Sequence, residues 1–279
     1  MSRSHLRFQI LAVATLLVGL LPATFGLAIE DPVQLAGAYF GWCVAMYLFG
    51  TGGTLVAATT FSPGEPQRPG WLLLAASFFV LVPATVVNGP KGSGLYEGGL
   101  RIPSVVLGSN VAWSLLAITA LILLSRAWRS SGLDVTSRGV RVVARLVALA
   151  LALALAGPDL VERFPAAVAG DPLAVGDVLT DVLDGALFVV AVPVLRAALS
   201  LGGGLVSWPW AMLTLSIAAW LGYDAVAIYG EAAGLTPRTV RAVEEVFRTL
   251  AASLAFSAGV SQRWVMTERE AHREEELAA

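Results

Sequence analysis

Long apolar runs alternate with short polar stretches along the whole of this 279-residue chain. A helix of about 20 apolar residues spans the hydrocarbon core of a bilayer, so each long run predicts a transmembrane helix. Eight runs qualify, and they cover residues 8–29, 35–60, 71–88, 104–128, 140–157, 174–200, 207–230 and 240–264. Clusters of Pro, Gly and acidic residues separate them, as at Glu30-Asp31-Pro32 and Gly157-Pro158. The pattern predicts an all-α integral membrane protein with eight transmembrane helices.

Composition supports the membrane class and excludes several kinds of chemistry. Hydrophobic residues make up 57% of the chain and charged residues 14%, whereas soluble domains carry about 25% charged residues. The net charge of −2 gives no reason to expect nucleic acid as a partner. Cys43 is the single cysteine, and the two histidines, His5 and His272, lie near the ends of the chain. We therefore expect no disulfide, no metal centre, no cofactor and no catalytic histidine, and interpret the protein as not an enzyme.

The distribution of arginine predicts the orientation. If the N-terminus lies inside, most of the 18 basic residues fall on the inner side of the predicted helices, as the positive-inside rule requires. The acidic stretches 30–31 and 159–177 then lie outside. We expect a multi-pass protein of the cell membrane with both termini in the cytoplasm.

Landmarks in the first half of the chain recur in the second half at a nearly constant offset. The pairs are Pro22 and Pro158, Asp31-Pro32 and Asp171-Pro172, Trp71 and Trp210, and Trp128 and Trp264. They predict two parallel four-helix repeats, although Pro and Trp also gather at membrane boundaries without any duplication. The resulting division is a first repeat at 1–129, a cytoplasmic linker at 130–139, a second repeat at 140–264 and a charged cytoplasmic tail at 265–279.

Acidic residues inside the predicted helices are confined to the second repeat. Asp177, Asp181 and Asp184 follow the spacing i, i+4, i+7 and therefore share one face of the sixth helix. The predicted topology places Asp224, Glu244 and Arg248 at a similar outer depth. Because intramembrane charges need protein or water around them, these six residues are the candidate ligand or ion site. The alternative is a set of structural ion pairs that lock helices six, seven and eight together, with Arg248 answering Asp184 or Asp224 and pairing with Glu244.

The matching positions of the first repeat carry no acids. Counting back by the repeat offset places Gly37 and Gly41 where the second repeat has aspartates. Their spacing is typical of helices that pack closely in lipid, so we expect the first repeat to be the rigid half and Gly41→Leu to wedge helices apart. We also expect Asp184 and Asp224 to be buried and Asp177 to be comparatively exposed.

Helices six and seven resemble the multi-span sensor regions found ahead of diguanylate-cyclase and histidine-kinase modules. The matching features are Asp184, Arg196, the Gly- and Trp-containing turn at 202–210, and Asp224 followed by Tyr229. The resemblance covers about 60 residues. The chain ends 15 residues after Trp264, so what the resemblance implies here is a sensor or accessory unit that acts through a partner.

Two functions remain open at this point. The first is a non-enzymatic membrane sensor or signalling module, surrounded by the lipid bilayer. It would take an unknown small ligand from the outer face into a pocket of the second repeat and act on a cytoplasmic signalling partner. The second is a small ion- or proton-coupled transporter that uses the intramembrane aspartates, which parallel repeats also suit.

Overall fold

A computed structural model describes residues 3–90, 95, 103–130, 138–201, 204–230 and 232–278. Its regular structure over these residues is entirely α-helical, as the sequence predicted. The helices are α1 (Arg3–Ala28), α2 (Pro32–Thr59), α3 (Arg68–Asn88), α4 (Pro103–Ser130), α5 (Arg138–Val168), α6 (Pro172–Ser200), α7 (Ser207–Tyr229) and α8 (Pro237–Ala278).

Seven of these helices, α1 to α7, are long and apolar enough to cross a membrane. The exposed surfaces of these helices are also apolar, as expected for helices in a membrane. Helix α5 alone exposes Val140, Val142, Val143, Leu146, Val147, Leu149, Leu151 and Leu153. Exposed apolar area on that scale marks contact with lipid or protein. The chain is therefore a multi-pass membrane protein. An eighth crossing by α8 stays a prediction, because that helix is more polar than the others.

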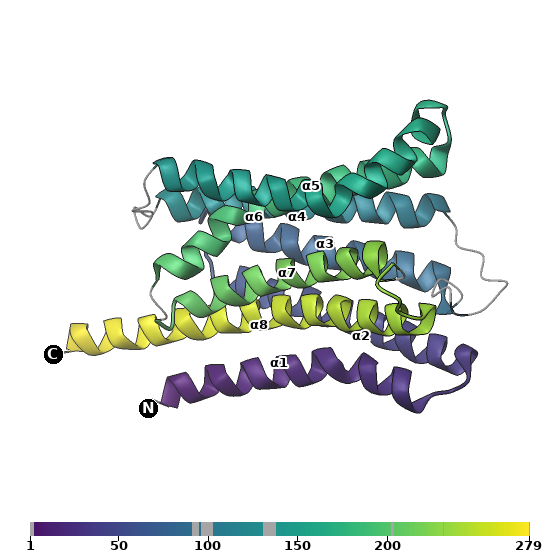
Figure 1. Cartoon of the computed structure of the whole chain (residues 1–279). Helices are drawn as coiled ribbons and strands as arrows, with labels where there is room; N and C mark the ends of the chain where they lie inside the picture. Colours follow the sequence, from purple (N-terminus) through teal and green to yellow (C-terminus); the bar gives the residue numbers. More distant parts are fainter. Residues whose placement is uncertain are drawn as a thin grey trace.

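Six helices form a closed ring in the order α2, α3, α4, α6, α7, α8, in which each packs against the next and α8 returns to α2. Outside this ring, α1 packs mainly on α8 and α5 mainly on α6. The helices run roughly side by side, and both termini lie at one end of the bundle (Figure 1). We call this the terminal end; the opposite end, where α1 passes into α2 and α7 into α8, is the distal end.

The middle of α8 is polar, and its polar side chains are buried inside the protein. Thr249, Ser253, Ser257 and Ser261 are all buried and recur every four residues, so they form one stripe. The Ser257 hydroxyl lies 2.5 Å from that of Thr15 on α1. Such side chains bond across helices within a membrane, where water is not available as a partner.

Glycine brings α8 and α2 into backbone contact. A Cβ added at Gly259 would collide with the backbone carbonyl of Gly53, and one added at Gly53 would collide with the backbone of Phe256. By contrast, a Cβ at Gly37 or Gly41 meets nothing within 4 Å. The predicted packing role of Gly37 and Gly41 is therefore wrong. Both lie on a side of α2 that is open at the Cβ position, whereas the close approach at Gly53 occurs about three turns or more further along the helix.

The expected break at Gly157-Pro158 is also wrong. Helix α5 continues through Pro158 and Pro165 to Val168, and its distal part bends away from the bundle (Figure 1). Proline removes one helical hydrogen bond and kinks a helix without having to end it. Consequently Asp159 and Arg163 belong to a helix, where the sequence had suggested an outer loop.

The charged tail continues α8 without interruption, because that helix extends from Pro237 to Ala278. Its last turns project beyond the ring at the terminal end (Figure 1). The predicted linker at 130–139 falls largely on residues outside the described part of the chain.

Candidate functional site

Three cavities lined by residues that the structure describes lie in the distal half of the bundle, and they share lining residues. The central cavity, of about 220 Å³, lies within the ring between α2, α3, α4, α7 and α8. The tryptophan cavity, of about 150 Å³, adjoins it and is lined by Trp113 of α4 and Trp220 of α7. The acidic cavity, of about 500 Å³, lies between α5, α6 and α7. Asn110 of α4 lines all three, so they lie next to one another in a series from the ring outward.

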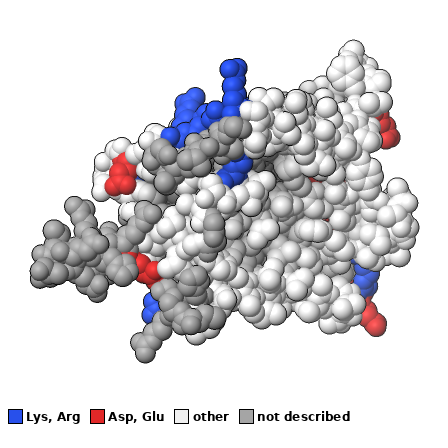
Figure 2. Space-filling model, turned by 60° about the vertical axis from the view of Figure 1, so that its left-hand side comes forward, with Lys and Arg blue, Asp and Glu red and all other residues white. Residues whose placement is uncertain are grey.

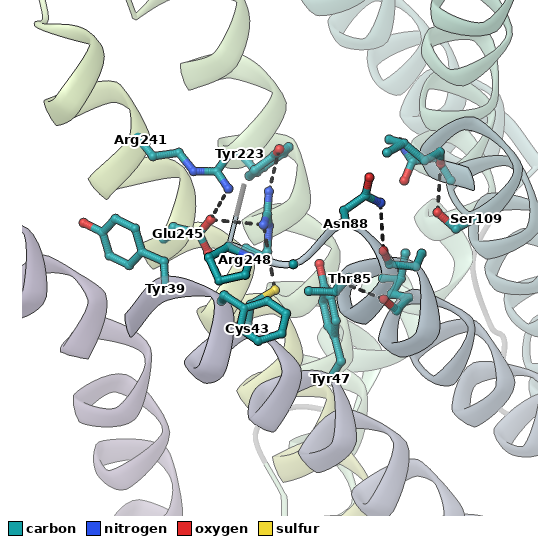
Figure 3. Close-up of a pocket in the computed structure, with 17 residues that line it drawn as sticks. Tyr39, Cys43, Tyr47, Thr85, Asn88, Ser109, Tyr223, Arg241, Glu245 and Arg248 are labelled. Atoms are coloured by element: carbon teal, nitrogen blue, oxygen red, sulfur yellow. Dashed lines mark hydrogen bonds and ion pairs between the residues drawn. The ribbon is translucent and has the colours of Figure 1, made fainter. Parts of the chain in front are cut away.

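A network of ion pairs on α8 forms one wall of the central cavity (Figure 3). The Glu245 Oε1 atom lies 2.6 Å from Arg241 Nη2 and 3.0 Å from Arg248 Nη1. Glu244 adds a second carboxylate 3.0 Å from Arg241 Nη1. Only 2% of Glu245 is exposed. Because a buried carboxylate is tolerated when it is paired and hydrogen-bonded, Glu245 holds two guanidinium groups in place at the cavity wall.

Arg248 is fixed from three helices. Its Nη2 donates to the Tyr223 hydroxyl of α7 at 2.8 Å, and its guanidinium carbon lies 4.9 Å from the centre of the same ring. Its Nη1 also reaches Cys43 Sγ of α2 at 3.8 Å. Figure 3 shows these groups converging on Arg248. A side chain held by α2, α7 and α8 at once couples the positions of those helices.

The acidic cavity carries an excess of carboxylates. Its acidic residues are Asp159, Glu162, Asp177, Asp181, Asp184 and Asp224, and its lining contains one basic residue, Arg163. Arg163 Nε binds Asp159 Oδ1 at 2.8 Å, and its Nη1 binds Asp177 Oδ2. Asp184 accepts a hydrogen bond of 3.2 Å from the Ser114 hydroxyl of α4. The Oδ2 atom of Asp181 is buried without a hydrogen-bond partner among the described residues.

The predicted site residues come together in two groups. Asp181, Asp184 and Asp224 line the acidic cavity and are half-buried, whereas the Asp177 side chain is 51% exposed, as its place near the end of α6 predicted. Arg248 lines the central and tryptophan cavities. Glu244 lies beside Arg241 on α8.

The predicted partners of Arg248 are wrong. It binds Glu245 and Tyr223, where we had expected Asp184, Asp224 or Glu244. Glu244 binds Arg241 instead. The physical reason is local. Residues three or four apart on one helix are already close together, so Arg248 pairs within α8. Glu245 is the partner because it lies, like Arg248, on the face of α8 that points into the ring.

Sequence reasoning missed the contribution of the first half of the chain. Tyr39, Tyr47 and Asn110 come from α2 and α4, so the cavities are not confined to the second half. Trp113 of α4 likewise lines the tryptophan cavity. The spacing of Arg241, Glu245 and Arg248 does indicate the α8 wall, since i, i+4 and i+7 share a face, and the i, i+4 pair of Arg241 with Glu245 is present. No sequence signal singled out Asn110 or Trp113.

This arrangement is able to bind a small molecule. No group of three metal-ligating side chains with suitable geometry occurs among the described residues. The cavities combine fixed guanidinium groups, free carboxylates, phenol and amide groups and an aromatic wall, which suits recognition of a small polar or charged molecule.

No family model, no curated protein and no solved structure matches this chain. The resemblance of helices α6 and α7 to sensor regions therefore stays a prediction.

Proposed function

We propose that this protein is a non-enzymatic membrane sensor or accessory module, in which a small ligand enters the distal cavities and α8 carries the response to the terminal end. The observation that carries the proposal is the continuity of α8. The helix presents Arg241, Glu245 and Arg248 to the central cavity and continues unbroken to Ala278. The 30 residues from Arg248 to Ala278 amount to about 45 Å of helix. Any shift or tilt of the cavity wall therefore moves the projecting end of the same rigid element.

The contrast in packing between the two halves of the ring supports the same proposal. On the terminal side of the cavities, Ala251, Ala252, Ala255 and Ala258 of α8 are fully buried. There, Gly53 and Gly259 bring the backbones of α2 and α8 together. The ring is thus closed toward the terminal end and hollow toward the distal end. A ligand in the distal half would act on the terminal half through helix packing.

Orientation and repeat structure belong to the proposal as well. Arg129, Arg141, Arg145 and Arg196 gather around a small pocket at the terminal end, and Figure 2 shows a group of basic side chains at the upper edge of the view, with separate ones elsewhere. By the positive-inside rule this end would face the cytoplasm and a signalling partner there. In a four-plus-four duplication, α2 corresponds to α6 and α8 corresponds to α4. The contact of α2 with α8 then corresponds to the contact of α6 with α4, and both contacts are present, which supports duplication.

A distance measurement tests the response of α8. Spin labels on cysteines introduced at Thr267 of α8 and Leu199 of α6 occupy exposed positions near the terminal end, and the buried native Cys43 should stay unlabelled. The protein is screened against amino acids, amines, carboxylates and sugars. We expect at least one compound that raises the melting temperature also to change this distance, and Arg248→Gln to abolish the change. A control pair at Leu6 of α1 and Leu199 should stay constant. Stabilising compounds that leave the Thr267 distance unchanged would contradict a sensor.

The second candidate function is a small ion- or proton-coupled transporter. The observation that favours it is the set of carboxylates, Asp181, Asp184 and Asp224, that lines adjacent cavities. The closed terminal half opposes it in this conformation. Uptake of a stabilising compound into proteoliposomes, driven by a proton gradient, would establish transport.

A further inference from the structure

The tryptophan cavity holds two carboxylates without a matching cation. Asp184 and Asp224 both line it, and none of the ion pairs among the described residues includes either one. The neighbouring bases are already engaged, because Arg163 binds Asp159 and Asp177, and Arg248 binds Glu245. Carboxylates at membrane depth are unfavourable unless a cation or hydrogen bonds compensate them. Ser114 supplies Asp184 with one hydrogen bond, so most of the compensation has to come from elsewhere.

The aromatic wall of the same cavity is an independent observation. The ring centroids of Trp113 and Trp220 lie 4.8 Å apart. Trp113 is only 8% exposed, and the indole N–H groups of both residues have no hydrogen-bond partner within the described part of the chain. Buried indole N–H groups normally have a partner. Tryptophan faces also attract organic cations, so the wall suits a ligand with a cationic group.

The size and remaining lining of the cavity define the body of that ligand. The volume is about 150 Å³, which is close to the size of a cavity that admits benzene. Leu81, Leu187, Phe188, Ile217 and Leu221 complete the apolar lining. Such a space fits one ring or a short aliphatic chain, with the polar group at the carboxylates.

We infer that the tryptophan cavity binds a small organic ammonium compound, with its ammonium group between Asp184 and Asp224 and its apolar body against Trp113 and Trp220. This inference deepens the proposed function by naming the ligand class, and it rests on that proposal only in placing a ligand in the distal cavities. The same cavity is lined by Tyr223 and Arg248, so an occupant would contact the charged network of α8 through them.

Three probes of one shape test the ligand class by isothermal titration calorimetry on protein in nanodiscs: phenethylamine, the neutral 2-phenylethanol and the anionic phenylacetate. Empty nanodiscs correct for partition into lipid. We expect phenethylamine to bind at least 10-fold more tightly than the alcohol and phenylacetate not to bind. Equal binding of amine and alcohol, tighter binding of the anion, or no binding of the amine would overturn the inference.

Variants locate the site. Asp184→Asn and Asp224→Asn should each weaken phenethylamine binding at least 10-fold. The matched control is Asp177→Asn, because Asp177 lines the acidic cavity, is exposed and is paired with Arg163. The affinity of this variant for phenethylamine should stay within about 2-fold of that of the unmodified protein. If an Asn variant does not fold, Asp184→Glu and Asp224→Glu replace it and should retain selectivity for amine over alcohol. Unchanged affinity in the Asn variants, or lost selectivity in folded Glu variants, would refute the assigned carboxylates.

The outcomes separate this inference from the proposed function. If phenethylamine binds with the expected pattern but the distance between labels at Thr267 and Leu199 stays constant, the ligand site stands and the sensor proposal fails. If another class of compound changes that distance while phenethylamine does not bind, the sensor proposal stands and the ammonium site fails.

Discussion

The distal and terminal halves of the helix ring differ sharply, although the same helices build both. In the distal half, α8 carries Arg241, Glu245 and Arg248, and cavities separate it from α3 and α4. In the terminal half, α8 carries small residues, and Gly259 lies against the backbone of α2. The comparison teaches that small residues close the ring where helices touch, whereas charged residues paired along α8 line a cavity where the ring is open.

The largest expected effect tests the closed half. Gly259→Leu should prevent folding, because its side chain would have to occupy the space of the Gly53 carbonyl, and a backbone cannot move aside as a side chain can. Size-exclusion chromatography of the detergent-solubilised protein should show loss of the monodisperse peak. Gly41→Leu is the matched control on α2 and should be neutral, since a Cβ there meets nothing within 4 Å. A folded Gly259→Leu variant with normal stability would mean that the two helices are not in close contact.

The next effect tests the charged wall. Glu245→Ala should lower the free energy of unfolding by about 3–5 kcal/mol, the usual loss when a buried charge is left without its partner, because both Arg241 and Arg248 depend on this carboxylate. Unfolding in mixed micelles with increasing denaturing detergent measures the change. Glu244→Ala serves as the comparison and should lower the free energy of unfolding by less, since Glu244 binds Arg241 alone among the described residues. Equal losses in the two variants would show that the pairing of Arg248 contributes nothing.

The smallest effect concerns the exposed end of the acidic cavity. Asp177→Asn should change the free energy of unfolding by less than about 1 kcal/mol, as is typical of solvent-exposed ion pairs. The side chains of Asp177 and Arg163 are 51% and 41% exposed. Thermal unfolding at low and high salt checks this, and the small difference should vanish at high salt because ions screen exposed charges. A loss as large as that of Glu245→Ala would place Asp177 inside the network that supports the fold.

Helix positions were largely predictable, and the exceptions have local causes. The runs at 35–60 and 174–200 match α2 and α6 within a few residues, because Asp31-Pro32 and Asp171-Pro172 start helices by chain geometry alone. The Asp31 carboxylate accepts a hydrogen bond of 2.7 Å from the Val33 N–H and thereby caps α2. Pro158 misled the prediction, since a proline kinks or ends a helix according to what surrounds it.

The candidate site was predictable only in part. Asp181, Asp184 and Asp224 could be identified because a carboxylate in an apolar segment is conspicuous in any sequence. Tyr47, Asn110 and Trp113 could not, because nothing distinguishes such residues at a cavity wall from the same residues in a packed core. Their role follows from the contacts of α2 and α4 with the second half of the chain, which are contacts between segments far apart in sequence.

The sequence by itself determined that this is a helical multi-pass membrane protein and where most of its helices begin and end. Those properties depend on hydrophobicity and capping, which act over a few neighbouring residues. The tertiary structure decided which glycines let helices touch, which carboxylate Arg248 binds and which carboxylates lack a cation. These outcomes depend on how each helix is rotated against its neighbours, and that rotation is set by the packing of all the helices together.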